Sequence, residues 1–163
     1  MKISLDLGDT VFNRSLPRLK FGCGEVMQLF SGCLGVLAGH VTQARDELFV
    51  ICRIDPGQEA RVCTSLIHAG LMPNLIDPRN VRFCFNRSDK GKIGSEMGVH
   101  VHIDDRVEVL NSMHNAGVKY KILFTGAHDD RKENGELAFK DGLFIVKDWQ
   151  EVGKLLRSLA WYC

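Results

Sequence analysis

The sequence predicts an α/β domain built on a mainly parallel central sheet with helices on both faces. Short apolar runs alternate along the chain with segments in which apolar residues have helical periodicity. Strands and helices in this order need crossover connections, which place consecutive strands parallel to one another. Each apolar run is continuous, which is typical of strands buried on both faces. Together these observations favour a three-layer architecture.

The individual elements are predicted from apolar spacing and from turn and capping residues. Strands are expected over residues 2–7, 48–52, 81–85, 99–103, 120–124 and 143–146. Helices are expected over residues 23–39, 58–69, 89–98, 106–115 and from 148 onward. Val26 and Phe30 begin the apolar spacing of the first helix, and Asp89 and Asp148 are expected to cap two others. A polar stretch over residues 126–141 is predicted to be a surface loop.

Composition indicates one ordinary globular domain. The chain has 163 residues, 45% of them hydrophobic and 25% charged, which suits a single domain over residues 1–163. The formal net charge of +1 gives no argument for nucleic acid or for an anionic membrane surface. The longest apolar-leaning stretch, residues 26–38, is too short to span a bilayer, and the first residues hold no signal-peptide core. We therefore expect a soluble, cytoplasmic protein.

The cysteines agree with a cytoplasmic location. They lie at positions 23, 33, 52, 63, 84 and 163, and none forms a Cys-x-x-Cys pair. A zinc ribbon or a thioredoxin-type motif is therefore not expected. Several lie inside apolar runs, where cysteine acts as a small buried hydrophobic residue. We expect all of them to be reduced thiols.

Charged residues follow the ends of the predicted strands. Asp6 lies near the end of the first strand, and Asp104 and Asp105 follow the fourth. Arg53 follows the second strand, and Lys90 comes shortly after the third. The carboxyl ends of parallel strands meet at one edge of the sheet, where ligands bind. Carboxylates gathered there repel one another unless a cation joins them, and Mg²⁺ prefers carboxylate and phosphate oxygens. The sequence therefore predicts a site for Mg²⁺ and phosphate.

Each of these residues also has an ordinary structural interpretation. Aspartates at strand ends often form turns, and Asp104 or Asp105 could cap the helix that follows them. Lys90 by itself could be a solvated helix residue. The functional interpretation is favoured because it explains two observations together, the order of these residues along the chain and their placement at strand ends. Separate structural roles would explain each residue only by itself.

The same residues resemble four ordered motifs of the haloacid dehalogenase-like superfamily, whose members are mostly Mg²⁺-dependent phosphohydrolases on a Rossmann-like sheet. The first motif, Asp-x-Asp-x-Thr after an apolar strand, is similar to residues 6–10, Asp-Leu-Gly-Asp-Thr. Cys52 stands at the position of the second motif's serine or threonine. Lys90 matches the lysine of the third motif, 14 residues before the acidic pair Asp104–Asp105 of the fourth. The resemblance covers essentially the whole chain and implies the same α/β fold.

The resemblance also implies a role for each matched residue. Asp6 is expected to be the nucleophile that forms an aspartyl-phosphate, and Lys90 is expected to hold Asp6 and the phosphate in place. The implied Mg²⁺ site consists of Asp6, the backbone carbonyl of Gly8, Asp104 and the adjacent Asp105. The implied phosphate contacts are Thr10, Cys52, Arg53 and Lys90.

Two residues depart from the family's pattern. Gly8 stands where the family has its general acid and base, and losing such a group costs on the order of 10²–10⁴ in rate. Asp9 is the candidate substitute, although neighbouring side chains on an extended segment point in different directions. Cys52 replaces a hydroxyl, and a thiol is a weaker hydrogen-bond donor. These departures leave two alternatives, a phosphohydrolase of weak activity and a catalytically impaired module that binds phosphate or phosphoproteins. A receiver-like phosphoacceptor domain is a more distant third.

The spacing of the motifs bears on the substrate. Only about forty residues separate Thr10 from Cys52, filled mainly by one predicted helix, so no large cap domain is expected. The site should be open to a phosphorylated small molecule or macromolecule, or be covered by the second subunit of a homo-oligomer.

His100 and His102 share one strand face, and packing or pocket-lining roles are expected for them. The basic stretch over residues 79–92 is either a solvated edge or an attraction for an anionic ligand.

Overall fold

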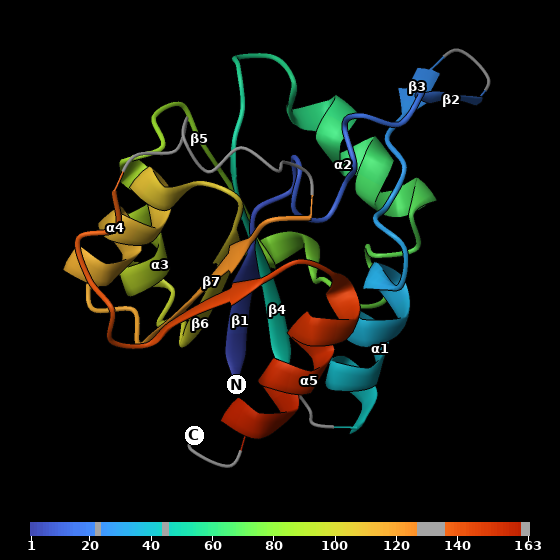
Figure 1. The fold of residues 1–163 in the computed structure, drawn as a ribbon. Helices are drawn as coiled ribbons and strands as arrows, with labels where there is room; N and C mark the ends of the chain where they lie inside the picture. The colour runs from blue at the N-terminus through green and yellow to red at the C-terminus, as the bar shows by residue number, and fades with distance from the viewer. Residues whose placement is uncertain (22–23, 44–45, 127–135, 161–163) are drawn as a thin grey trace.

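Six parallel strands form the central sheet of the computed structural model, which describes residues 1–21, 24–43, 46–126 and 136–160 (Figure 1). The strand order is β5-β4-β1-β6-β7-β8, so the chain builds outward from β1 in both directions. A ligand site is expected beyond the carboxyl ends of the strands at the point where the order reverses, which is next to β1. The strands are β1 (Lys2–Leu5), β4 (Glu47–Arg53), β5 (Val81–Cys84), β6 (Val101–Asp104), β7 (Tyr120–Phe124) and β8 (Leu143–Val146).

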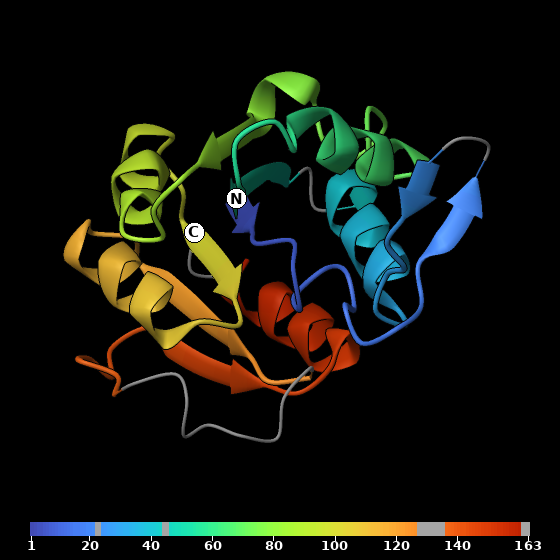
Figure 2. The ribbon, with the colours of Figure 1, turned by 90° about the horizontal axis from the view of Figure 1, so that it is seen from above.

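Helices cover both faces of this sheet and confirm the predicted three-layer α/β fold. Seen from above, α3 and α4 lie on one side, and α1, α2 and α5 lie on the other (Figure 2). A short 3₁₀ helix, Pro78–Asn80, precedes β5. The helices are α1 (Cys33–Gln43), α2 (Glu59–His68), α3 (Asp89–Glu96), α4 (Val107–Asn115) and α5 (Trp149–Leu159).

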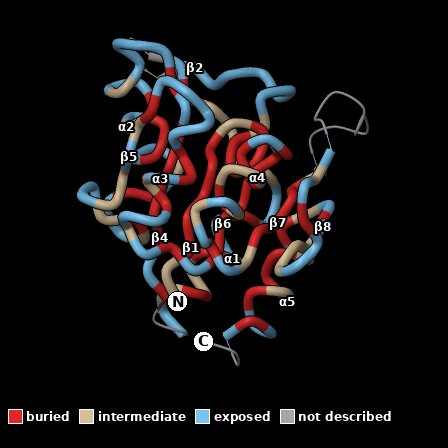
Figure 3. The backbone as a smooth tube through the Cα atoms, turned by 90° about the vertical axis from the view of Figure 1, so that its left-hand side faces the viewer, coloured by how far each residue is buried: buried red, intermediate tan, exposed pale blue. Residues whose placement is uncertain are grey.

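The core lies between the sheet and its helices. The central strands are buried along most of their length (Figure 3). Ile3 and Leu5 in β1 are fully buried, as are Val101 and Ile103 in β6. Because both faces of these strands are covered, the intervening residues Ser4 and His102 are buried as well.

The prediction of a helix over residues 23–39 is wrong in its first half. A short antiparallel hairpin occupies part of this region, with strands β2 (Leu19–Phe21) and β3 (Gly24–Val26). The backbone N–H of Phe30 donates to the carbonyl of Val11 at 3.0 Å, so this segment is tied to the loop after β1 rather than coiled. Gly32, with φ of 79°, then turns the chain into α1, which begins at Cys33.

The capping predictions had two outcomes. Asp148 caps α5 as expected, because its carboxylate accepts the backbone N–H of Glu151 at 2.8 Å. Asp89 does not cap α3, because it is the first helical residue; Ser88 holds the capping position and makes no side-chain capping bond. Asp89 therefore lies in the first turn, where a carboxylate still suits the helix dipole.

Other expectations concern segments at the surface. Residues 127–135 of the predicted loop lie outside the described residues, while Phe139 near its end is buried.

None of the described helices is long and apolar enough to cross a membrane. Four of the predicted thiols are free in the structure, and the other two, Cys23 and Cys163, lie outside the described residues. The four free thiols are Cys33, Cys52, Cys63 and Cys84.

Candidate active site

The pairing of β1 with β6 brings two of the predicted aspartates together. In this register Ser4 lies opposite His102 and Leu5 opposite Ile103. The backbone N–H of Asp6 then donates to the carbonyl of Ile103 at 2.9 Å, which continues the ladder one step beyond β1. Asp6 therefore comes to lie beside the end of β6, where Asp104 is.

Lys90 joins these two carboxylates. Its Nζ donates to Oδ1 of Asp6 at 2.5 Å and to Oδ2 of Asp104 at 2.8 Å, and only 2% of its side chain is exposed. Burial disfavours the charged ammonium, but the attraction of Asp104 and Asp6 outweighs this and raises the pKa of Lys90. Lys90 is therefore a cation held between the predicted nucleophile and a predicted metal ligand.

The position of Lys90 depends on a close approach between α3 and α4. A Cβ at Gly91 would lie 2.3 Å from the backbone carbonyl oxygen of Ser112, and one at Gly94 would lie 2.8 Å from Sδ of Met113. Only glycine permits this contact, which lets α3 pack closely against α4. The helix then presents Lys90 to the end of β1.

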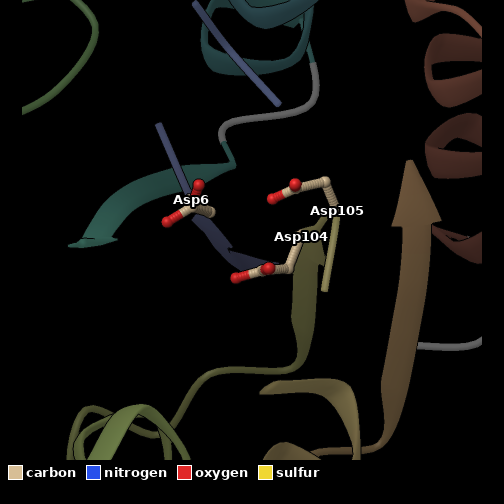
Figure 4. Close-up of side chains that lie close together, drawn as sticks. All are labelled: Asp6, Asp104 and Asp105. Atoms are coloured by element: carbon tan, nitrogen blue, oxygen red, sulfur yellow. The ribbon is translucent and has the colours of Figure 1, made fainter. Parts of the chain in front are cut away.

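Three carboxylates gather at this edge of the sheet. Asp6 comes from the end of β1, and Asp104 and Asp105 come from the end of β6 (Figure 4). One oxygen from each lies within 4.8 Å of the others. Asp104 also accepts the backbone N–H of Arg106 at 2.9 Å, and Asp105 pairs with Nε of Arg106 at 3.2 Å. The cluster is buried, so mutual repulsion is poorly screened.

Burial and neighbouring charges shift the pKa values of the three carboxyl groups. Burial, followed by the charges of Asp104 and Asp6, raises the pKa of Asp105 to about 7. Burial also raises the pKa of Asp6, against the lowering effect of Lys90. For Asp104, burial is outweighed by Lys90 and His102, and its pKa falls to about 2. A divalent cation would relieve the repulsion.

The donor set of this cluster fits Mg²⁺. It offers carboxylate oxygens only, which a hard cation prefers, and each carboxylate has more acceptor sites than its hydrogen bonds use. Gly8, whose carbonyl is the further predicted ligand, lines the same cavity as these carboxylates. The metal ligands implied by the resemblance thus line one cavity.

His102 is a site residue for which only a packing or pocket-lining role was predicted. It is fully buried, with Nε2 3.1 Å from Oδ2 of Asp104 and Nδ1 2.7 Å from Oγ of Ser4. Burial lowers the pKa of His102, which favours the neutral ring. Because the Asp104 carboxylate only accepts, Nε2 carries the proton and Nδ1 accepts from the Ser4 hydroxyl. His102 and Ser4 thus hold the Asp104 carboxylate in position by hydrogen bonds.

A signal for this support was present in the sequence. Ser4 precedes Asp6 by two residues and His102 precedes Asp104 by two, so each pair shares one strand face. His100, by contrast, is exposed, and its Nδ1 accepts the backbone N–H of Lys2 at 3.1 Å. The two histidines therefore have different roles, and only His102 belongs to the site.

The predicted phosphate contacts are partly assembled. Cys52 at the end of β4 and Arg53 after it line the same cavity as Asp6 and Lys90. Burial raises the pKa of the Cys52 thiol, which stays protonated as a weak donor. Thr10 is fully buried and does not line this cavity, and its hydroxyl has no hydrogen-bond partner among the described residues. Its contact with phosphate stays a prediction.

The turn after β1 determines what surrounds Gly8. Asp9 adopts φ of 61°, is buried, and forms an ion pair with Arg14. Nε of Arg14 donates to Oδ2 of Asp9 at 2.7 Å. The same arginine lies over Gly8, with Nε 3.4 Å from where a Cβ would be. Asp9 does not line the cavity, so its service as acid and base stays a prediction that this ion pair opposes.

A cavity of about 250 Å³ opens beside the carboxylates. It is bounded by the connections that follow β1, β4, β5 and β6. Besides the residues already described, its walls carry an unusual number of guanidinium groups. These are Arg14, Arg18, Arg53, Arg61, Arg87 and Arg106.

Solved structures with the same fold place these observations in context. A haloacid dehalogenase-like family hydrolase from Xanthomonas campestris matches with a TM-score of 0.67 and 12% identity, over 98% of this chain and 95% of that one. A haloacid dehalogenase-like hydrolase from Burkholderia xenovorans matches with a TM-score of 0.61 and 17% identity, over 80% of this chain and 59% of that one.

A third similar structure is a phosphatase. The cobalt-bound form of the deoxy-D-mannose-octulosonate 8-phosphate phosphatase from Haemophilus influenzae matches with a TM-score of 0.53 and 12% identity, over 98% of this chain and 88% of that one. No protein-family model and no curated protein matches this chain. The structural likenesses show that the chain has the haloacid dehalogenase-like fold.

Proposed function

Since the chain has this fold, we propose that it is a Mg²⁺-dependent phosphohydrolase that uses Asp6 as its nucleophile. The observation that carries the proposal is the buried Lys90, which contacts both Asp6 and Asp104 beside Asp105. Three carboxylates and a lysine buried together cost free energy, and such arrangements occur where chemistry needs them. The similarity to a phosphatase supports the same reaction class.

In this proposal each residue has a definite part. Asp6 attacks the phosphorus of a phosphorylated substrate and forms an aspartyl-phosphate, which water then hydrolyses. Lys90 favours the ionised form of Asp6 and places it for attack, and it offsets charge on the phosphate. Cys52 and Arg53 contact the phosphate from the end of β4. Mg²⁺, held by Asp6, Asp104, Asp105 and the carbonyl of Gly8, would supply positive charge to the phosphate oxygens.

A second candidate function is retained because of Gly8. The glycine has no side chain to transfer a proton, and the neighbouring carboxylate of Asp9 is bound by Arg14. These two facts favour a catalytically impaired module that binds phosphate or a phosphoprotein in the cytoplasm. Both functions use the same cavity, and they differ in turnover.

The test is hydrolysis of p-nitrophenyl phosphate by the parent and by Asp6→Asn, with Mg²⁺ and with a chelator. We expect turnover that needs both Mg²⁺ and Asp6. The matched control is Asp141→Asn, an exposed aspartate away from the cavity, which should keep the parent rate. Turnover by Asp6→Asn would contradict the proposed nucleophile. Phosphate binding without any turnover would favour the second candidate.

A further inference from the structure

Resting on the proposed function, we propose that this cavity takes phosphoanhydrides, in which the group that leaves is itself a phosphate. Two independent features of the cavity lead to this substrate class. One is the lack of a spare carboxyl group to protonate the leaving group, and the other is the concentration of arginines on the cavity walls.

The first feature concerns the carboxyl groups that line the cavity. Asp6 is the nucleophile, and Asp104 and Asp105 form the cation site. Asp55, the remaining lining carboxylate, pairs with Arg53 at 2.8 Å. Among the described lining residues, no carboxyl group is therefore left over to act as the acid for a departing oxygen. Gly8 stands where that donor would be.

A substrate whose leaving group departs without a proton would not need the missing acid. An alkoxide is about as basic as hydroxide, whose conjugate acid has a pKa of about 15.7, and it leaves slowly unless it is protonated. The second pKa of a phosphate group is about 6, so it departs readily as an anion. An anhydride thus avoids the need for the missing acid, whereas an alkyl phosphate does not.

The second feature is the set of guanidinium groups that line the cavity. Six of the nine arginines among the described residues line this one cavity, and they come from the segments at or after the ends of β1, β4, β5 and β6. A guanidinium presents its N–H groups in a planar fork that matches phosphate oxygens. The leaving group of an anhydride carries several negative charges, and these arginines would bind it.

Five of these arginines pair with carboxylates, and the pairs formed by Arg18, Arg53 and Arg87 are largely exposed and therefore weak. Arg18 pairs with Glu25 at 3.5 Å and Arg87 pairs with Glu108 at 3.1 Å, with roughly half of each side chain exposed. Exposed pairs of this kind contribute about 0–1 kcal/mol, so a phosphate competes for the guanidinium. Arg61 differs, because its partner in the described part of the chain is the neutral Oε1 of Gln58 at 3.4 Å.

Arg61 is therefore the residue assigned to the leaving phosphate. It belongs to the first turns of α2, next along the chain from Arg53, and both line the cavity. A cavity of about 250 Å³ has room for a compact diphosphate group and leaves any larger substituent in solvent.

The chemical step balances without an added acid. An oxygen of Asp6 bonds to the terminal phosphorus while the bridging P–O bond breaks, and its electron pair stays on the departing phosphate. Water then attacks the phosphorus of the aspartyl-phosphate, and the bond to Asp6 breaks to restore the carboxylate. One proton of that water stays on the inorganic phosphate, and the other goes to solvent.

The test compares four substrates with Mg²⁺: inorganic pyrophosphate, p-nitrophenyl phosphate, fructose 1,6-bisphosphate and glycerol 3-phosphate. Pyrophosphate has both a good leaving group and a second phosphate. p-Nitrophenyl phosphate has a good leaving group but no second phosphate, and fructose 1,6-bisphosphate has a second phosphate but a poor leaving group. We expect the highest kcat/KM for pyrophosphate. In Arg61→Gln the ratio of kcat/KM for pyrophosphate to that for p-nitrophenyl phosphate should fall about ten- to hundredfold.

Two controls make the outcomes separable. Arg79→Gln removes an exposed arginine that does not line the cavity, and it should keep the parent ratio. In the Asp6→Asn background, calorimetric binding of the non-hydrolysable imidodiphosphate should weaken when Arg61 is replaced by glutamine. Hydrolysis of p-nitrophenyl phosphate with no preference for pyrophosphate overturns the anhydride inference alone. No hydrolysis of any of the four overturns the proposed function, and the anhydride inference with it.

Discussion

Nε2 of His102 lies 3.1 Å from Oδ2 of Asp104, the same oxygen that accepts a hydrogen bond from Lys90. One carboxylate oxygen therefore has a neutral donor on one side and a cation on the other. Through His102 this support reaches Ser4 in the neighbouring strand. The orientation of the predicted metal ligand thus depends on a buried chain of side chains that never contacts substrate.

Replacing His102 should reveal this support. His102→Ala removes a hydrogen-bond partner from both Ser4 and Asp104 in a buried place, and we expect the free energy of unfolding to fall by about 1–3 kcal/mol. Urea denaturation measures the change. His100→Ala is the matched control, because His100 is exposed, and it should change stability by less than about 0.5 kcal/mol. Equal effects of the two substitutions would contradict the account.

Replacing Lys90 should leave two buried carboxylates without their cation. We expect Lys90→Met to lower the free energy of unfolding by about 3–5 kcal/mol. Mg²⁺ should then raise the melting temperature of this variant more than that of the parent, because the metal supplies the missing positive charge. Lys92→Met, in the same helix but largely exposed, is the control and should behave as the parent does. A Lys90→Met protein that gains nothing from Mg²⁺ would argue against a cation site here.

The close contact of α3 with α4 offers a backbone-level test. Gly91→Ala places a Cβ 2.3 Å from a carbonyl oxygen, so we expect a loss of about 1–3 kcal/mol in stability and a displaced Lys90. Gly35→Ala in α1 meets nothing within 4 Å and should instead stabilise by up to about 1 kcal/mol. Thermal melts of the two variants should therefore move in opposite directions, and melts that move together would disprove the packing argument.

The two departures from the family pattern can be reversed. In Gly8→Asp with Cys52→Ser, the new Cβ at position 8 meets only ordinary van der Waals distances from the flexible Arg14, so the change is accommodated. We expect turnover of glycerol 3-phosphate to rise by about 10²–10⁴, because a proton donor again serves the leaving group. If the double variant is no more active than the parent, the missing groups do not explain weak activity.

Much of the site could be predicted from sequence because it depends on strand ends. Asp6 and Asp104 each end an apolar run, and parallel strands bring such ends to one edge. The placement of Lys90 could be predicted from its order in the motifs, and its contact with Asp6 was expected from the resemblance. Its contact with Asp104 was not expected, because it depends on how closely α3 packs on α4.

Other features depend on contacts between distant segments. The helix expected over residues 23–39 fails because part of that segment pairs with the loop after β1. The role of His102 depends on which residue of β1 lies opposite it. The arginine-rich cavity is assembled from connections far apart in the chain, so the net charge of +1 gave no hint of it.

The most direct test of the central claim is a crystal structure with Mg²⁺ and beryllofluoride, which mimics a phosphoryl group on a carboxylate. The account predicts beryllium bonded to an oxygen of Asp6, with Mg²⁺ bound by Asp6 and Asp104 and with Lys90 in contact with the fluoride. A structure in which Asp6 carries no beryllofluoride while Mg²⁺ binds elsewhere would contradict it.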